Sequence, residues 1–235
     1  MISVIIPVYN TPAELMKCLA SLAKQIYREF EVIIVDDGSV PQFPISNFQF
    51  PNLDIEFFRI KHGGAPKARN FGFEKSKGEY VLFCDADLEL KEDCLEKMLK
   101  ALRDNPDKSY AYSDFKYGWK KFKFWPFDAE KLKEHNYINI CSLLRRENFS
   151  GFDESLPKFQ DWDLWLTLLE QGKTGAYIPE VLFKASTKRG SMSKWLPKIV
   201  YKLPLLKLRE KGKYEKWKKI VLNKHNLLHS AGSDL

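Results

Sequence analysis

Short apolar runs alternate with helical stripes along the first hundred residues of the chain. The runs Ile2–Pro7, Phe30–Val35 and Ile55–Ile60 are rich in β-branched residues or bounded by turn residues, so each predicts one strand. Two sets of apolar residues recur at helical spacing, and each set predicts one helix. The sets are Leu15, Cys18, Leu19 and Leu22, and then Leu95, Met98, Leu99 and Leu102. Strands that alternate with helices predict an α/β fold with a doubly wound, mostly parallel sheet.

A fourth apolar run, Tyr80–Cys84, ends in two carboxylates, Asp85 and Asp87, which are spaced i, i+2. The carboxyl ends of parallel strands form the edge where open α/β sheets bind ligands. Carboxylate oxygens suit a hard ion such as Mg²⁺ or Mn²⁺, which keeps waters and completes its shell with substrate phosphates. Taken alone, an acidic turn before a helix is the commoner explanation of such a pair.

Two further segments add binding chemistry at the same edge. The second strand closes with Asp36 and Asp37 before turn residues, and the third is followed by Gly63-Gly64 and a helix that carries Arg69. Paired glycines let backbone approach a ligand closely, and a helix start offers N–H groups to phosphate. Without other motifs these residues are equally consistent with an ordinary loop and a surface salt bridge.

Taken together, these motifs resemble a known family. Val4–Asn10, Val35–Ser39, Gly63-Gly64 with Ala68–Asn70, and Asp85-Ala86-Asp87 occur in the order and approximate spacing of inverting glycosyltransferases of family 2, which have the GT-A fold. The likeness continues through Gln160–Trp165 and Pro179–Phe183, so it covers about residues 1–190. Four motifs in register are much more specific than any one of them.

The resemblance implies a role for each matching residue. Asp37 would bind the nucleotide base, and Pro7, Tyr9 and Asn10 would line its pocket. Asp85 would lie near the ribose and the metal, with Ala86 beside it in the nucleotide site, and Asp87 would ligate Mn²⁺ or Mg²⁺. Gly63, Gly64 and Arg69 are expected on the donor side. Arg189 and Ser191 belong to a segment that resembles a lid over the diphosphate. Leu88 stands where the family often has a third Asp, which leaves the tightness of metal binding open.

Asp161 resembles the catalytic base of the family. It lies in the first turn of a helix predicted from Gln160 to Leu169, and an inverting transfer needs one carboxylate to remove the acceptor hydroxyl proton. Gln160 replaces the acidic residue that often precedes this Asp. An ordinary acid that favours a helix N-terminus is the alternative. Asp163 is expected to be structural.

Residues 109–151 differ in character from the first half. Tyr110–Phe115 predicts a strand, and Tyr117–Phe127 interleaves aromatic residues with lysines, which favours a half-buried hairpin on the acceptor side. The same mixture could stack on single-stranded nucleic acid, but no RNA-binding motif accompanies it. Arg145-Arg146 and the Gly151-Phe152-Asp153 turn look like the approach to an acceptor site.

Charge gathers in the last part of the chain. From Lys188 to Lys224 there are thirteen basic and two acidic residues, a net +11, so the rest of this +7 chain carries about −4. Trp195, Leu196, Ile199, Val200 and Leu203 share one helical face among lysines, which suits either an anionic membrane surface or packing on protein. We therefore divide the chain into a donor half at 1–108, an acceptor half at 109–190 and a basic amphipathic helical tail at 191–235.

Composition narrows the class further. With 235 residues, 44% of them hydrophobic, the chain can bury a full core. No apolar stretch is long enough to span a bilayer, and no signal peptide precedes the first strand, so we expect a cytoplasmic protein. Peripheral contact with the inner face of the membrane through residues 191–224 stays open beside packing of the tail on protein. The four cysteines lack the spacing of a zinc site or a disulfide framework. Monomer and homodimer both stay open.

The sequence therefore predicts a metal-dependent inverting glycosyltransferase, which moves a sugar from a nucleoside diphosphate donor, a UDP-sugar in our interpretation, to a hydroxyl of a glycan or lipid-linked acceptor. A catalytically silent GT-A domain in a membrane-associated assembly is the non-enzymatic alternative, and the intact Asp87 and Asp161 argue against it. A nucleotidyltransferase is the nearest enzymatic alternative, but no glycine-rich G-x-G-x-R loop follows the first strand. A signalling receiver domain is shorter than this chain and has no use for Gly63-Gly64 and Arg69.

Overall fold

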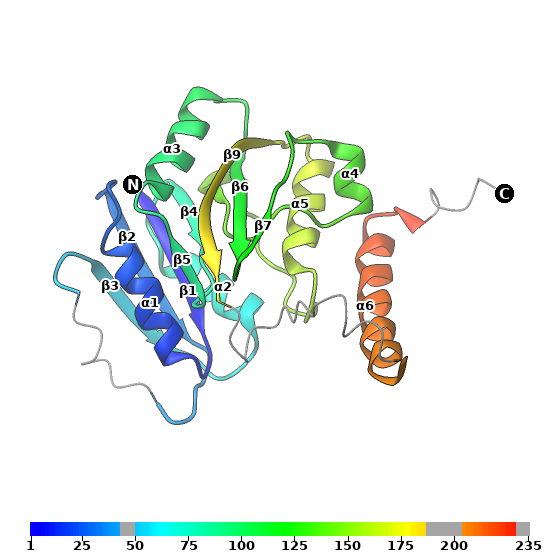
Figure 1. The fold of residues 1–235 in the computed structure, drawn as a ribbon, viewed down its shortest axis with the longest axis horizontal. Helices are drawn as coiled ribbons and strands as arrows, with labels where there is room; N and C mark the ends of the chain where they lie inside the picture. Colours follow the sequence, from blue (N-terminus) through cyan, green and yellow to red (C-terminus); the bar gives the residue numbers. More distant parts are fainter. Residues whose placement is uncertain (43–49, 187–203, 229–235) are drawn as a thin grey trace.

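A single mixed sheet organises the chain, seen here in a computed structural model that describes residues 1–42, 50–186 and 204–228 (Figure 1). Its strand order is β3-β2-β1-β4-β8-β6-β9-β5, and β7 pairs with β6 outside this path. The strands are β1 (Ile2–Val8), β2 (Phe30–Asp36), β3 (Asp54–Arg59), β4 (Tyr80–Phe83), β5 (Leu88–Leu90), β6 (Tyr110–Tyr117), β7 (Lys120–Phe122), β8 (Leu143–Arg145) and β9 (Gly175–Ala185).

The first half of the sheet is parallel, as the sequence predicts. β1 lies between β2 and β4 and pairs in parallel with both, and β3 extends this half on the far side of β2. The fully buried β-branched residues of β1 and β2 fit a strand that is covered on both faces. This parallel half brings the ends of β1, β2 and β4 to one edge.

The second half of the sheet is mixed. β8 runs antiparallel to both β4 and β6, β9 runs parallel to β6, and β5 closes the edge antiparallel to β9. The expected hairpin is confirmed, since β6 and β7 pair antiparallel and Phe115 stacks on Phe122. The sequence patterns did not indicate β5 or β8, which have three residues each, and did not give β9 as a strand, although it has eleven residues.

Helices cover both faces of the sheet and bury two apolar layers. α1 (Pro12–Leu22) and α3 (Cys94–Asp104) pack on one face, and their predicted apolar stripes are buried there. α2 (Ala65–Lys75), α4 (Ala129–Glu134) and α5 (Gln160–Glu170) cover the other face, where Trp162 and Trp165 are fully buried. This arrangement confirms the doubly wound α/β class.

The basic tail contains one described helix, α6 (Pro204–Lys224). Its C-terminal end packs on the domain, because Val221 is fully buried in the same layer as α5. The apolar face predicted from Trp195 to Leu203 lies outside the described residues. None of the helices described here is both long and apolar enough to cross a bilayer.

Candidate active site

The acidic pair lies on a turn that joins β4 to β5. The Cys84 amide donates to the Ile5 carbonyl (2.9 Å), so the pairing with β1 continues to the residue before Asp85. The turn closes when the Leu88 amide donates to the Asp85 carbonyl (3.0 Å), and the Ser186 amide holds the Asp87 carbonyl from the end of β9 (3.0 Å). The backbone therefore fixes Asp85 and Asp87 at the edge where β1 and β4 end.

The pKa of Asp87 is raised to about 6, chiefly by burial and in addition by the negative charge of the neighbouring Asp85 carboxylate. A desolvated carboxylate beside a like charge favours either a proton or a cation. Among the described residues no group of three or more His, Cys, Asp or Glu side chains is arranged to hold a metal ion by itself. Two carboxylates alone fit an ion such as Mg²⁺ or Mn²⁺, which takes its other ligands from water and phosphate.

Arg69 of α2 joins this turn to the start of α5. Its side chain is only 5% exposed, and its Nη2 donates to Asp85 Oδ1 at 2.6 Å while its Nη1 donates to Gln160 Oε1 at 2.9 Å. The guanidinium lies over the Phe152 ring, 5.5 Å from the centroid. A planar guanidinium that holds two partners fixes their separation, so the acidic turn and the start of α5 are held at a fixed distance from each other.

Asp161 faces the same cluster from the first turn of α5. Burial raises the pKa of its carboxyl, a hydrogen bond from Asn136 and the charge of Arg69 act against that rise, and the charge of Asp85 adds to it. The residue before the helix, Phe159, has a positive φ of 63°, which is a rare conformation for an aromatic residue and sets the direction in which α5 begins. Asp161 is thus a partly desolvated carboxylate near Arg69 and Asp85.

Asp37 belongs to a second group, at the end of β2. Its carboxylate is buried and accepts hydrogen bonds from the amides of Gly63 and Gly64, both at 2.8 Å. His62 Nδ1 lies 2.9 Å from the same carboxylate. Gly64 has a φ of 92°, a conformation that favours glycine. The amides that we expected to face a phosphate therefore bind Asp37, and the direct role of these glycines toward a nucleotide stays a prediction.

The first motif packs beside this loop. The Tyr9 ring is 45% exposed and stacks on His62 with ring centroids 4.3 Å apart. Asn10 has a positive φ of 55°, its amide donates to Ser39 Oγ, and its Oδ1 accepts from the Val40 amide. Pro7 lies in β1 opposite Val35 of β2. The residues expected to line the base pocket are therefore neighbours.

The structure brings most of the predicted site residues into these two groups, but not all of them. Ala86 lies in the turn between Asp85 and Asp87, whereas Arg189 and Ser191 lie outside the described residues. Sequence reasoning missed Asn136, whose neighbours form no motif, and His62, which precedes the paired glycines. The side chain of Asn70, which belongs to the Ala68–Asn70 motif, joins α2 to the backbone of Phe152. Its Nδ2 donates to the Phe152 carbonyl, and its Oδ1 accepts from the Phe152 amide.

The guanidiniums of Arg145 and Arg146, which we expected at the approach to an acceptor, bind backbone carbonyls. Arg146 donates to the carbonyls of Gly78, Ser76 and Phe73 and to Ser76 Oγ, where α2 ends. Arg145 donates to the carbonyls of Leu102 and Lys108 near the end of α3. Both guanidiniums therefore hold helix ends, because unsatisfied carbonyls at a helix C-terminus attract cationic donors.

Comparison with known proteins identifies the family of this chain. The family model described as glycosyl transferase family 2 matches residues 3–157. This chain belongs to glycosyl transferase family 2. An uncharacterized glycosyltransferase of Haemophilus influenzae is 31% identical over 211 residues, which cover 82% of this chain and 71% of that protein.

Solved structures of this family's fold also match. S. aureus TarS 1-349 in complex with UDP-GlcNAc has a TM-score of 0.70 at 21% identity, and the match covers 86% of this chain but only 63% of the TarS chain. The mannosyltransferase PcManGT from Pyrobaculum calidifontis, in complex with GDP-Man and Mn²⁺, has a TM-score of 0.64 at 17% identity over all of this chain and 76% of the other. At these identities the structures show the shared fold, which confirms the expected GT-A architecture.

Proposed function

We propose that this family 2 member is a metal-dependent, inverting glycosyltransferase that uses a UDP-sugar and acts on a hydroxyl of a glycan or lipid-linked acceptor. The observation that carries this proposal is the bridge through Arg69, which ties Asp85 on the donor turn to Gln160 beside Asp161. Departure of the diphosphate and deprotonation of the acceptor hydroxyl must occur close together. This bridge holds the residues that we propose for the two steps near each other. The donor residues come from 1–108 and Asp161 from 109–190, in keeping with the two halves that we propose.

On the donor side, Asp87 and Asp85 are the residues that would hold the ion. Bound there, a divalent cation supplies charge neutralisation for the departing diphosphate. Asp37, Tyr9 and Asn10 lie at the ends of β2 and β1, where the nucleoside would sit. The UDP-GlcNAc complex of TarS supports a uridine donor, while the GDP-Man complex of PcManGT makes a guanosine donor the variant to test against it.

On the acceptor side, Asp161 would accept the proton of the attacking hydroxyl. A general base works best when its pKa lies closer to the working pH than that of a free carboxylate, and burial raises the pKa of Asp161 in that direction. The Asn136 hydrogen bond limits the rise in the pKa of Asp161. Inversion follows if the deprotonated acceptor oxygen attacks the anomeric carbon opposite the leaving diphosphate.

A donor screen by thermal shift, with and without Mn²⁺, tests the proposal. The true donor raises the melting temperature by mass action, and we expect this rise to depend on the ion. Asp87→Ala should lose the metal-dependent part of the rise, whereas the matched control Asp107→Ala, an exposed carboxylate beyond α3, should keep it. A rise that is equal with and without Mn²⁺, or equal in both variants, would contradict the metal role.

A further inference from the structure

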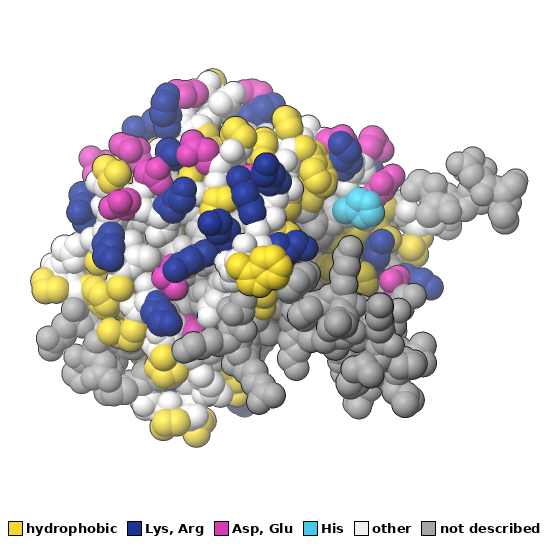
Figure 2. Space-filling model, in the orientation of Figure 1, with side chains coloured by type: hydrophobic (Ala, Val, Ile, Leu, Met, Phe, Trp, Pro, Cys, Tyr) yellow, Lys and Arg dark blue, Asp and Glu magenta, His cyan; other side chains and the backbone are white. Residues whose placement is uncertain are grey.

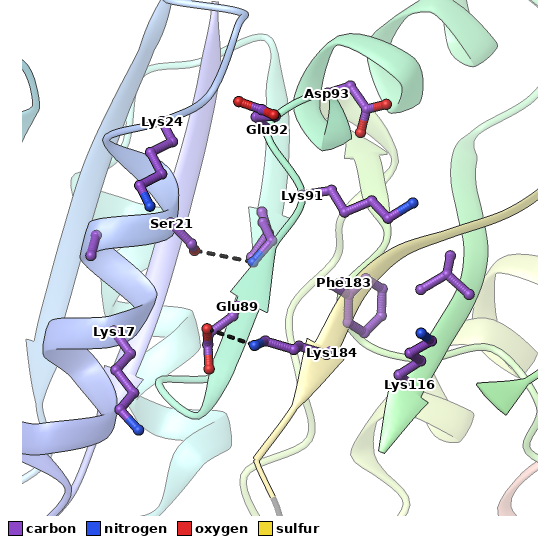
Figure 3. A pocket seen from close by; sticks show the side chains of 13 residues that line it. Lys17, Ser21, Lys24, Glu89, Lys91, Glu92, Asp93, Lys116, Phe183 and Lys184 are labelled. Carbon is purple, nitrogen blue, oxygen red and sulfur yellow. Dashed lines mark hydrogen bonds and ion pairs between the residues drawn. The ribbon is translucent and has the colours of Figure 1, made fainter. Parts of the chain in front are cut away.

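A separate hollow of about 740 Å³ lies between α1 on one side and β5, β9 and β6 on the other. Figure 3 shows its walls, with Lys17 and Lys24 on the α1 side, Glu89 on β5, and Lys184 and Lys116 across from α1. Its volume is in the range of ligand clefts. None of the residues assigned above to the donor or the base lines it, and we name it the lysine groove.

The lysine groove carries an excess of unneutralised positive charge. Five lysines line it, Lys17, Lys24, Lys91, Lys116 and Lys184, together with Glu89, Glu92 and Asp93. Lys184 pairs with Glu89 at 3.0 Å, and Asp93 pairs with Lys97 at 2.8 Å, so two of the three acids are neutralised. The other four lysines form no ion pair within the described part of the chain. Figure 2 shows Lys and Arg side chains gathered on this face of the molecule.

Three lysines of one cross-strand row repel one another beside the groove. Lys121 of β7 and Lys184 of β9 both lie directly opposite Lys116 of β6. Like charges directly opposite each other destabilise a sheet. Lys121 has Asp114 at 3.3 Å and Lys184 has Glu89, but the central Lys116 has no carboxylate partner among the described residues. A bound anion would remove this repulsion.

The lysine groove begins beside the acidic turn. The pair Glu89 and Lys184 lies one step along the β5–β9 ladder from Leu88, the residue after Asp87. On the facing wall, the Leu90 amide of β5 donates to the Ser21 hydroxyl of α1 at 3.0 Å, so α1 lies against β5. Lys17 lies one helical turn before Ser21, nearer the end of α1 that follows β1. The groove therefore leads away from the candidate active site along α1.

We propose that the lysine groove binds a polyanionic glycan, a chain with repeated carboxylate or phosphate groups, and that this chain is the acceptor. Only the second part rests on the proposed function. A glycan chain that enters the hollow can contact side chains on both of its walls, whereas a flat lipid surface contacts side chains that protrude from the protein. Trp119, at the β6–β7 turn three residues from Lys116, is 86% exposed and offers a flat ring on which a sugar can stack.

Direct binding of soluble probes tests the groove without any transfer reaction. The probes are oligogalacturonate, inorganic polyphosphate and a neutral malto-oligosaccharide, titrated into the full chain at two salt concentrations. We expect the two anions to bind and the neutral chain not to, with affinity falling as salt rises. The variant Lys17→Gln/Lys24→Gln/Lys116→Gln should weaken anion binding by about tenfold.

The control variant Lys100→Gln/Lys173→Gln/Lys219→Gln removes the same charge from α3, the turn after α5, and α6. It should bind the anions within about twofold of the parent, because the loss is specific to the groove. Equal weakening of anion binding in both variants would show that net charge alone causes the effect, and this would overturn the proposal. So would binding of the parent to phosphatidylglycerol vesicles, lost in the groove variant, without binding to either soluble anion.

Donor binding separates this inference from the proposed function. The groove variant should keep the full donor-induced thermal shift, because its lysines lie outside the donor residues. If the parent shows no donor shift at all but binds the anions through the groove, the proposed function fails and the binding site stands. If the donor shift is present and anion binding is absent, the groove proposal fails alone.

Discussion

Arg69 Nη2 donates a 2.6 Å hydrogen bond to Asp85 Oδ1, and this contact connects the acidic turn after β4 to α2. The other terminal nitrogen of the same guanidinium holds Gln160, next to Asp161. Because one rigid plane carries both donors, a change at Arg69 shifts the turn and the start of α5 relative to each other. The contact therefore determines the spacing between the donor side and the proposed base.

Arg69→Lys should lower kcat/KM by about 100-fold, because an ammonium cannot hold Asp85 and Gln160 together in a fixed geometry. We also expect the free energy of unfolding to fall by about 2 kcal/mol, since a buried charged hydrogen bond is lost. Steady-state transfer assays and urea unfolding measure the two effects. Arg103→Lys, an exposed residue of α3, is the control and should change neither; a normal kcat/KM in Arg69→Lys would exclude the spacing role.

Asp161→Asn should lower kcat by about 10²- to 10⁴-fold and leave the donor-induced thermal shift intact, because the variant removes only the proposed general base. It should also raise the melting temperature at neutral pH. The pKa of Asp161 is raised in the folded protein, so its ionised form costs stability above that pKa, and asparagine avoids this cost. The gain should disappear as the pH falls toward 3.8, the usual value for this carboxyl. Melting curves from pH 4 to 8 measure it.

Asp163→Asn is the matched control two residues further along α5. Asp163 is buried against His225 and Lys224, each 2.9 Å away, and the sequence already indicated a structural role. Its loss should therefore lower the free energy of unfolding by about 3 kcal/mol, the opposite sign to Asp161→Asn, because it leaves a buried cation with fewer partners. Stabilisation by both variants would show that generic removal of negative charge, rather than the burial of Asp161, causes the effect.

Arg146→Ala should destabilise the protein by about 2 kcal/mol without changing the KM for acceptor. The guanidinium satisfies the carbonyls at the end of α2, so its loss leaves them without a donor. Chemical unfolding and acceptor titration measure the two quantities. A raised acceptor KM at unchanged stability would restore the acceptor role that the sequence suggested.

The sequence predicts the parts of this fold that local patterns encode. β1, β2 and β4 are continuous apolar runs, and the stripes of α1 and α3 repeat at helical spacing, so each could be found without knowledge of its partners. β5 and β8 have three residues each and are strands only because β9 and β4 pair with them. Short segments carry too little periodicity for prediction.

The candidate site divides in the same way. Asp85, Asp87 and Asp161 stand in motifs and could be selected from the sequence. The contacts of Arg69, Arg146 and Asp37 could not, because each depends on residues that are distant in the chain and meet only in the fold. A basic side chain in a motif is equally compatible with a substrate, a carboxylate or a helix end, and only geometry separates these possibilities.

His225 docks the end of α6 onto α5 and should make that docking depend on pH. Its ring is 3% exposed, Nε2 lies 2.9 Å from Asp163 Oδ1, and Nδ1 lies 2.8 Å from Glu170 Oε1. Both ring nitrogens face carboxylates, so both must donate, which requires the imidazolium form. Burial acts to lower the pKa of His225, but the hydrogen bonds from Asp163 and Glu170 outweigh it and raise the pKa above 6.5.

His225→Gln should therefore lower the free energy of unfolding by about 2 kcal/mol at pH 6, and the difference from the parent should shrink as the pH rises through the raised pKa. Because the folded state binds the proton more tightly, the stabilising contribution of His225 is complete below pH 6.5 and is lost as the pH rises through the raised pKa. Lys224, which also contacts Asp163, keeps its charge over this range. Urea unfolding at several pH values measures the difference, with His135→Gln as an exposed control; a difference that is constant with pH would assign the effect to packing alone.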